Sequence, residues 1–308
     1  MDNELLLFDR LEAIKTVNQK HDLEHNAYLS FSGGKDSTIL HYLLDMALPN
    51  NRIPRVFIDT GIEYMAIREF VMGLAEKDDR FVIVKPTKPV KQMLEKYGYP
   101  FKSKQHSHTL SIYQHSGMSR AVRVYLGEDI TKTGNKSNMF KCPNQLKYQF
   151  TPEFALKCSD LCCMKMKKEP ALKWCKANNI SITITGMRAS EGGARQTLGC
   201  IITNKDGSLH KFHPLVKVDD EWEKWFVDKL ETSGGGQVLC KLYYPPYNFV
   251  RTGCKGCPFA LHLKEELETL ERLLPNERRA CEIIWKPVYD EYRRINYRLK
   301  NVERIKLF

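Results

Sequence analysis

Four cysteines with the spacing of metal ligands carry the clearest potential for chemistry in this sequence. Cys162 and Cys163 are adjacent in DLCCMKMKK, and Cys254 and Cys257 form a Cys-x-x-Cys in RTGCKGCPF. Adjacent residues are poorly placed for a disulfide, since their Cα atoms lie ~3.8 Å apart and disulfides usually span ~4.4–6.8 Å. Four thiolates can bind zinc or a [4Fe–4S] cluster. An adjacent pair suits two corners of a cubane better than one tetrahedral zinc, so the pattern favours the cluster, with zinc or no metal as the alternatives.

Residues near these cysteines could support the same centre. Cys158 precedes Cys162 by four residues, so in a helix it would lie one turn away and could replace a ligand. Three lysines that follow the pair would offset thiolate charge or attract an anionic substrate: Lys165, Lys167 and Lys168. Four other cysteines are scattered, and we expect them to be packing residues: Cys175, Cys200, Cys240 and Cys281.

The segment SGGKDS, residues 32–37, has the composition of a phosphate-binding loop: Ser32, Gly33, Gly34, Lys35, Asp36 and Ser37. Its two glycines permit backbone conformations that other residues avoid, so successive N–H groups can surround an anion at the start of the following helix. The hydroxyls and the lysine add donors and charge. The segment lacks the four-residue spacer of a Walker A loop, and its lysine precedes aspartate. The alternative is a simple glycine turn.

Strands and helices alternate around this loop. We expect strands at 27–31, 55–58, 81–85 and 180–185, and helices at 4–20, 38–47, 63–77 and 89–97. This alternation predicts an α/β fold, a parallel doubly wound sheet with helices on both faces. Ligands bind beyond the carboxyl ends of such strands, where SGGKDS, DTGIEY and TGMRASEGGAR all lie.

The remaining segments suggest three regions: an N-terminal helix at 1–24, a nucleotide-binding α/β domain at 25–232, and a cysteine-bearing, mainly helical C-terminal region at 233–308 that packs on the core. A polar, basic insertion at about 98–160 would hold short helices near 107–126 and form a flap that faces the substrate. We expect a hairpin around Asp206-Gly207, a helix at 220–230, a flexible joint at 233–237, and a helical tail at 258–308 interrupted by Pro275 and Pro287.

The composition narrows the class of protein. The 308 residues include 48 lysines and arginines against 37 aspartates and glutamates, a net charge of +11. This balance favours a polyanionic partner, either nucleic acid or a phosphorylated small molecule, although a solvated basic surface is an alternative. The acidic start MDNELLLFDR has no signal-peptide pattern, and no apolar run reaches the ~18 residues of a membrane span. We therefore expect a cytoplasmic protein, with no membrane partner and an undetermined oligomeric state.

SGGKDS after a strand resembles the pyrophosphate loop of the PP-loop ATP pyrophosphatase superfamily. Three further segments narrow the resemblance to the phosphoadenosine phosphosulfate reductase family: FIDTGIEY (57–64), TGMRASEGGARQ (185–196) and HPLVKVDDEWEKWF (213–226). The cysteine pattern resembles the iron–sulfur adenylylsulfate reductases and the DNA phosphorothioation ATP pyrophosphatase. The resemblance implies an adenine nucleotide alpha hydrolase-like sheet, bound ATP or an adenylylsulfate-type nucleotide with Mg²⁺, and a [4Fe–4S] cluster on Cys162, Cys163, Cys254 and Cys257.

The resemblance also implies residue roles. Residues 32–37 would hold the phosphates, with Lys35 and Asp36 in catalysis, and Gly186 would border the nucleotide. Asp59, Thr60 and Gly61 would line the adenosine side. Arg188 and Arg195 would face the anionic reacting group, because guanidinium forks suit phosphate or sulfate. The alternative for each arginine is a surface ion pair.

The C-terminal sequence favours one activity over another. Sulfonucleotide reductases carry a nucleophilic cysteine on a C-terminal tail, whereas this chain ends in NVERIKLF. We therefore expect an ATP pyrophosphatase that adenylates an acceptor, DNA or RNA, for sulfur insertion, with a cysteine desulfurase as sulfur donor. One alternative is an adenylylsulfate or phosphoadenylylsulfate reductase that uses Cys281 or a thioredoxin-like partner. Another is a non-catalytic module that binds nucleotide or nucleic acid.

Overall fold

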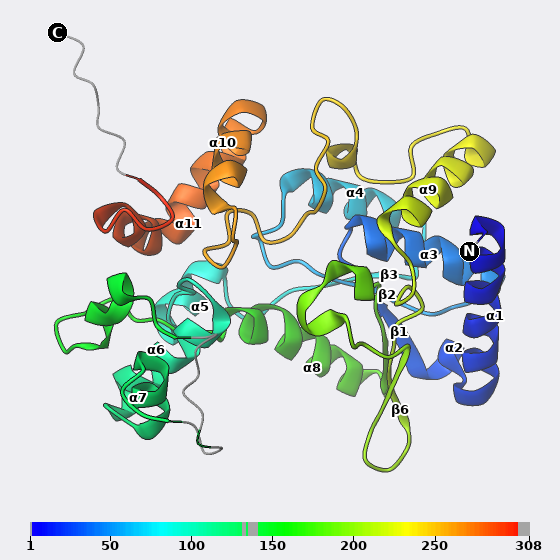
Figure 1. Cartoon of the computed structure of the whole chain (residues 1–308). Coiled ribbons are helices and arrows are strands. Elements are labelled where there is room, and N and C mark those ends of the chain that lie inside the picture. Colours follow the sequence, from blue (N-terminus) through cyan, green and yellow to red (C-terminus); the bar gives the residue numbers. More distant parts are fainter. Residues whose placement is uncertain (1, 131–133, 135–140, 301–308) are drawn as a thin grey trace, which may run out of the picture. The chain divides into compact units, whose positions relative to one another are not determined.

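The computed structural model describes residues 2–130, 134 and 141–300. The chain divides into two compact units (Figure 1). The first unit comprises residues 1–86 and 169–253, and the second comprises residues 87–168 and 254–308. No helix within the described part of the chain is long and apolar enough to cross a membrane.

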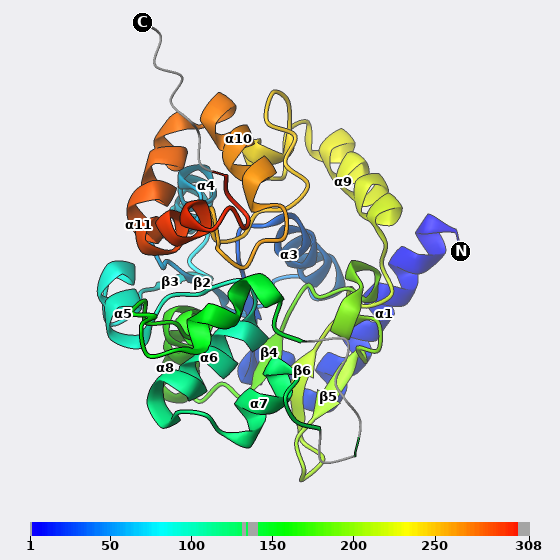
Figure 2. The ribbon, with the colours of Figure 1, turned by 60° about the vertical axis from the view of Figure 1, so that its left-hand side comes forward.

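The first unit is built on a six-stranded sheet in the order β3-β2-β1-β4-β6-β5. Its strands are β1 Ala27–Ser30, β2 Arg55–Ile58, β3 Phe81–Val84, β4 Ile182–Ile184, β5 Ile201–Thr203 and β6 Leu209–Phe212. All neighbouring pairs are parallel except β5 and β6, which form the hairpin expected around Asp206-Gly207. Figure 2 shows β4, β6 and β5 at one side of this sheet. The predicted α/β fold with a mainly parallel sheet is confirmed.

Helices on both sides of the sheet bury its apolar side chains. They are α1 Asn3–His21, α2 Leu23–Asn26, α3 Lys35–Ala47, α4 Met65–Ala75, α8 Glu169–Ala177 and α9 Asp220–Gly234. Figure 1 shows α3 and α4 on one side of strands β1–β3 and α8 on the other. The core side chains of α3 are fully buried: Ile39, Leu40, Leu43 and Leu44. The sheet therefore holds the start of α3, and with it the phosphate loop, in a fixed place.

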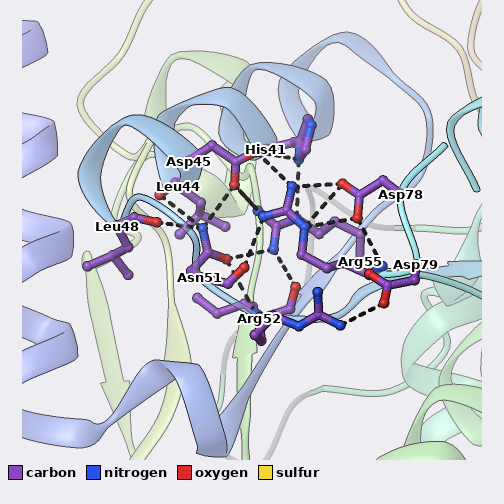
Figure 3. Close-up of polar contacts among 11 residues, drawn as sticks. His41, Leu44, Asp45, Leu48, Asn51, Arg52, Arg55, Asp78 and Asp79 are labelled. Atoms are coloured by element: carbon purple, nitrogen blue, oxygen red, sulfur yellow. Dashed lines mark hydrogen bonds and ion pairs between the residues drawn. The ribbon is translucent and has the colours of Figure 1, made fainter.

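A buried polar network connects the amino ends of strands β2 and β3 (Figure 3). The guanidinium of Arg55, the first residue of β2, donates to Asp45 (2.6 Å), to Asn51 (2.8 Å) and to Nδ1 of His41 (3.2 Å). Asp45 also accepts from Arg80 at 2.7 Å. Burial, and then the charge of Arg55, lowers the pKa of His41 to about 4, so its ring is neutral and can accept this hydrogen bond. The network lies at the strand ends opposite to the phosphate loop.

The second unit is mainly helical over its described residues. It contains α5 Val90–Tyr97, α6 Lys104–Ser116, α7 Arg120–Leu126, the short helices Asn144–Phe150 and Met164–Lys168, α10 Leu263–Leu273 and α11 Pro275–Arg294. Its core includes a buried histidine, His106, whose Nε2 lies 2.7 Å from the Gln149 amide oxygen and whose Nδ1 lies 3.0 Å from the Tyr125 hydroxyl. The predicted short helices near 107–126 and the helical C-terminal region are confirmed.

Two boundary predictions are wrong. Pro275 begins α11 as expected of a helix-starting proline, but Pro287 lies inside α11 without ending it. Buried aromatic residues on both sides of Pro287, Trp285 and Tyr289, hold the helix in the core. The joint expected at 233–237 begins later, because α9 continues to Gly234 and ends at Gly235, whose φ of 70° is left-handed. Parts of the predicted insertion and tail, 131–133, 135–140 and 301–308, lie outside the described residues.

Candidate functional site

The phosphate loop joins β1 to α3, and its last three residues form the first turn of that helix. Gly33 has a φ of 70°, and a Cβ there would lie 2.8 Å from side-chain methyls of Ile67 and Val71. Only glycine therefore fits this position. Ser37 Oγ donates to the Gly34 carbonyl at 2.9 Å and lies 3.1 Å from Ser32 Oγ. Hydrogen bonds of its own serine hydroxyls therefore stabilise the conformation of the loop.

A cavity of about 410 Å³ opens over this loop within the first unit. It brings together eight of the predicted site residues: Ser32, Gly34, Lys35, Asp36, Ser37, Gly186, Arg188 and Arg195. Gly186 permits the close approach of the β4 end to α3, since a Cβ there would lie 3.0 Å from Asp36. The walls of the cavity also include Tyr243 and Thr252, which the sequence analysis did not identify. The Lys35 N–H donates to Tyr243 Oη at 3.0 Å, and that hydroxyl lies 2.6 Å from Thr252 Oγ1.

Four predicted residues do not line this cavity. Gly33 packs against α4, at Ile67 and Val71. Asp59 accepts from the Arg68 guanidinium at 3.0 Å, and the Thr60 hydroxyl donates to Glu63 at 2.8 Å. Gly61 has a φ of 80° in the turn after β2. The structure thus uses the Asp-Thr-Gly segment in a local turn beside the loop strand, and its adenosine role stays a prediction.

Charged side chains converge at the cavity. Arg188 is 6% exposed, and its guanidinium pairs with Asp36 at 3.0 Å and with Asp220 at 2.8 Å. The ammonium of Lys35 lies 2.7 Å from Glu223, a carboxylate with no exposed surface. Arg195 pairs with Glu191 and stays partly exposed. Both arginines therefore make ion pairs, but Arg188 does so inside the site rather than on the surface.

Glu223 is a buried residue in contact with Lys35 and Arg188 that the sequence interpretation missed. Its oxygens lie 2.7 Å from Lys35 and 3.2 Å from Arg188, although neither oxygen has a hydrogen bond of good geometry within the described residues. Burial, and then the neighbouring Asp36 carboxylate, raises the pKa of Glu223 to about 8. The available signal was its position on α9 between buried Trp222 and Phe226, where a charged residue is unexpected.

The four predicted cysteine ligands all lie in the second unit. Cys162 and Cys163 directly precede the short helix Met164–Lys168, and the Cys257 N–H donates to the Cys254 carbonyl at 3.3 Å in a tight turn. Burial raises the pKa of Cys162, and the Cys254, Cys163 and Cys257 thiols raise it further, which indicates that the four thiols are neighbours. Within the described residues, no three His, Cys, Asp or Glu side chains converge as ligands of one metal ion. The four thiols are therefore neighbours without converging on one point.

The Cys-x-x-Cys turn is held by α11. Trp285 Nε1 donates to the Lys255 carbonyl at 3.0 Å, Tyr292 Oη to the Pro258 carbonyl at 2.9 Å, and Tyr289 Oη to the Gly256 carbonyl. These aromatic residues lie on one face of α11, at i, i+4 and i+7. A buried ion pair, 2.6 Å between Lys255 and Glu277, adds to them. Three backbone carbonyls in and beside the turn thus accept hydrogen bonds from α11, which fixes the backbone positions of Cys254 and Cys257.

Other cysteines have structural surroundings. Cys158 is fully buried in an isolated bridge with Tyr99, so the predicted helical turn between Cys158 and Cys162 is wrong. Cys281 is fully buried in α11, and burial raises its pKa to about 12. Such a thiol is a poor nucleophile at neutral pH. Cys240 is buried, while Cys175 and Cys200 are partly exposed.

Comparison with known families gives one domain match. The sequence model of the phosphoadenosine phosphosulfate reductase domain matches residues 26–139, so the predicted resemblance to that family is confirmed over this segment. An uncharacterized protein of Methanocaldococcus jannaschii is 38% identical over 73 residues, which are 24% of this chain and 17% of that protein. The matching region thus spans about a sixth of the length of that relative.

Several solved structures align with this chain at low identity. A phosphoadenylyl-sulfate reductase from Candida auris is 16% identical, with a TM-score of 0.40, over 70% of this chain and 76% of its own. An NH₃-dependent NAD synthetase from Campylobacter jejuni is 13% identical, with a TM-score of 0.38, over 93% of this chain and 94% of its own. A U34-tRNA thiolase from Methanococcus maripaludis, solved with its [4Fe-4S] cluster, is 14% identical, with a TM-score of 0.38, over 96% of this chain and 80% of its own.

Proposed function

We propose that this chain, whose residues 26–139 match the phosphoadenosine phosphosulfate reductase domain, is an ATP-using enzyme that adenylates an acceptor for sulfur insertion. The observation that carries the proposal is the cavity of about 410 Å³, in which the phosphate loop meets Lys35 and Arg188. Backbone N–H groups, two cations and serine hydroxyls on one wall form a site for a polyphosphate. In the proposed reaction an acceptor oxygen attacks the α-phosphorus, the bond to pyrophosphate breaks, and the acceptor gives up its proton.

Six residues of the cavity have roles in this proposal. The hydroxyls of Ser32 and Ser37 and the start of α3 bind the pyrophosphate, with Mg²⁺ bound to ATP. Lys35 neutralises the leaving group, and Arg188 faces the α-phosphate, where negative charge develops. Asp36 orients Arg188 through the 3.0 Å ion pair. Arg195, which is partly exposed at the rim, contacts the acceptor or a terminal phosphate.

The acceptor in this proposal is a nucleic acid, supported by the net charge of +11. After adenylation, a sulfur nucleophile replaces AMP on the acceptor, and a cysteine desulfurase supplies that sulfur. The turn after β2, with Asp59, Thr60 and Gly61, contacts the adenosine. We propose the cytoplasm as the site of this activity.

The four neighbouring cysteines of the second unit fit a [4Fe–4S] cluster by their donor chemistry. All four residues are partly exposed, and their mutual repulsion as thiolates would be relieved by a cationic iron centre. Cys254 and Cys257 lie on a backbone turn that α11 already fixes, whereas Cys162 and Cys163 come from a second segment. When bound, such a cluster supplies an iron site for sulfur chemistry or for structural support. Zinc on the same cysteines is the alternative.

Two other functions are distinguishable from this one. A sulfonucleotide reductase needs a reactive thiol, and the burial and raised pKa of Cys281 argue against that residue in this role. A non-catalytic module would bind nucleotide without turnover. The complete phosphate loop beside Lys35 and the buried Arg188 favours catalysis over binding alone.

The test compares reactions of the purified protein. Pyrophosphate release from ATP is measured with and without DNA or RNA, alongside sulfite release from adenylylsulfate. Arg188→Ala should lower pyrophosphate release at least about 100-fold. The matched control is Arg52→Ala, an exposed arginine paired with Asp79 at the far end of the sheet, which should leave it unchanged. Sulfite release at a comparable rate would overturn the proposal, and nucleotide binding without any turnover would favour the non-catalytic module.

Metal content is tested separately. Protein purified without oxygen should contain about four iron atoms and show a broad absorbance band at ~400 nm. Cys254→Ser should remove this band, whereas Cys175→Ser, a partly exposed cysteine of the first unit, should keep it. A spectrum unchanged by Cys254→Ser would refute the ligand assignment.

A further inference from the structure

The positive charge of this protein is unevenly divided between its two units. The second unit contains 27 lysines and arginines against 14 aspartates and glutamates, a net charge of +13. The first unit, which holds the phosphate loop, contains 21 against 23 and has a net charge of −2. The basic character that suggested a polyanionic partner is therefore a property of the second unit alone.

Most of this excess comes from one segment. Residues 87–168 include 15 lysines and arginines and only 5 aspartates and glutamates, a net charge of +10. An excess spread over a whole segment suits a polymer, since duplex nucleic acid has one negative charge per ~1.7 Å of its axis. A small phosphorylated ligand would need only a few converging cations.

Lysines gather at α5 and the segment packed against it. Lys157 Nζ donates to the Lys96 carbonyl at 2.6 Å. The ammonium of Lys165 lies 4.8 Å from the centroid of the Tyr97 ring, and the ammonium of Lys96 lies 5.2 Å from it. The chain just before this cluster contains Cys162 and Cys163. The ammonium groups of Lys96 and Lys165 thus lie near the ring of Tyr97, and that of Lys157 is bonded to the neighbouring Lys96 carbonyl.

Helix stability does not explain these lysines. A cation near the end of a helix is favourable, which would account for Lys96, but a cation in the first turn is unfavourable. α5 nevertheless has Lys91 in its first turn and no acidic residue there, and α6 likewise begins with Lys104. Lys91, Lys96 and Lys157 are exposed, and none of the three makes an ion pair with another described residue.

We propose that α5 and residues 157–168 form a nucleic-acid contact surface, in which Lys91, Lys96 and Lys157 bind backbone phosphates. This inference rests on the proposed function for its biological purpose, since it assigns the acceptor polymer to the second unit. Like charges that repel one another in the isolated protein would be neutralised by phosphates. Such contacts are independent of sequence and release counterions, so they make affinity depend on salt.

The experiment measures binding of a fluorescein-labelled 20-base-pair DNA duplex and of the matching single-stranded RNA by anisotropy at several NaCl concentrations, without ATP. The variant Lys91→Glu/Lys96→Glu changes two exposed lysines of α5. The control variant Lys173→Glu/Lys176→Glu makes the same charge change on two exposed lysines of α8 in the first unit. Urea unfolding confirms that both variants fold.

With at least one of these nucleic acids, the α5 variant should bind roughly tenfold more weakly and reduce the slope of log K against log salt by about two, one for each lost phosphate contact. The control should retain the wild-type slope. Equal losses in both variants would show a general charge effect and overturn the proposal. An unchanged slope in the α5 variant would also overturn it, because these lysines would then not contact phosphates. Pyrophosphate release with and without nucleic acid is measured in parallel. If wild type lacks this activity but the slope still falls, the proposed function fails while the surface stands.

Discussion

The ammonium of Lys35 lies 2.7 Å from the carboxylate of Glu223, which has no exposed surface. Arg188 approaches the same carboxylate at 3.2 Å, and Asp36 lies beside it. A helix of the first unit, α9, thus places a buried carboxyl group directly beneath the two cations that the proposed reaction uses. Glu223 thus contacts both cations, and in the proposed reaction its protonation state would set the charge that an incoming phosphate meets.

The first prediction concerns nucleotide affinity and pH. Burial and the neighbouring Asp36 raise the pKa of Glu223 to about 8, so the group is neutral below that pH. Lys35 and Arg188 are then balanced by Asp36 and Asp220, and deprotonation above pH 8 adds one negative charge. ATP affinity should therefore fall as the pH rises through about 8, by up to about tenfold per pH unit. Equilibrium binding of a fluorescent ATP analogue between pH 6.5 and 9.5 measures it.

Glu223→Gln should bind ATP with little pH dependence over this range, since an amide cannot ionise. The matched control is Glu221→Gln, an exposed residue of the same helix, which should keep the wild-type profile. If Glu223→Gln retains the wild-type fall in affinity, another group controls the site.

The second prediction concerns stability and follows from the same shift. The folded protein retains the Glu223 proton up to about pH 8, whereas the unfolded chain releases it near the ordinary value of 4.5. Between these values the folded state binds more protons, so its stability should fall as pH rises. Between about pH 4.5 and pH 8, the unfolding free energy of wild type should fall relative to that of Glu223→Gln by up to about 1.4 kcal/mol per pH unit. Above pH 8 the difference between the two proteins should stay constant. Urea denaturation at pH 5, 6.5, 8 and 9 tests this, and a difference that is already constant below pH 8 would contradict it.

The third prediction concerns the network at the amino ends of β2 and β3. Arg55→Met removes the donor shared by Asp45, Asn51 and His41 and leaves buried polar atoms unpaired (Figure 3). It should lower the free energy of unfolding by about 3 kcal/mol. The control Arg52→Met breaks an exposed pair with Asp79 and should cost less than about 1 kcal/mol. Urea denaturation compares the two, and equal losses would mean that burial of Arg55 is unimportant.

The sequence was sufficient for the sheet of the first unit. Strands were recognisable from apolar runs such as RVFI and FVIV, each followed by polar turn residues, and parallel pairing follows from their alternation with helices. The carboxyl ends of β1 and β4 then had to share an edge, which brought Lys35 and Arg188 together. These inferences depend on local patterns and on one topological rule.

The partners of buried residues were not predictable in the same way. The face of α11 with Trp285, Tyr289 and Tyr292 was recognisable as apolar, but its contact with the Cys-x-x-Cys turn depends on packing of segments distant in sequence. Glu223 looked like one acid among several in DDEWEKW, because burial of a charge is decided by tertiary contacts. The cysteine pattern predicted that residues 162–163 and 254–257 lie close together, but no sequence signal assigned the rest of 87–168 and 254–308 to one unit.

The fourth prediction concerns the glycines of the Cys-x-x-Cys turn, TGCKGC. Gly256 has a φ of 58°, and a Cβ there would lie 2.4 Å from Tyr289 Oη and 2.7 Å from Cys281 Sγ. Gly256→Ala must therefore displace the turn from α11 and move the base of Cys254 and Cys257. Gly253, by contrast, has an ordinary φ and open space where a Cβ would lie, so Gly253→Ala is a matched control. We expect Gly256→Ala to lose at least about half of its bound iron and to melt several degrees lower, since a strained, overpacked site typically costs 1–3 kcal/mol.

Iron content and the ~400 nm band after anaerobic purification measure the cluster, and thermal unfolding measures the packing against α11. Gly253→Ala should match wild type in both. If Gly256→Ala lowers the melting temperature but neither it nor wild type contains iron, the packing argument holds and the cluster assignment fails. If Gly256→Ala matches wild type in melting temperature and iron, α11 does not fix the turn, because the backbone would then have accepted a side chain where the structure leaves no room for one.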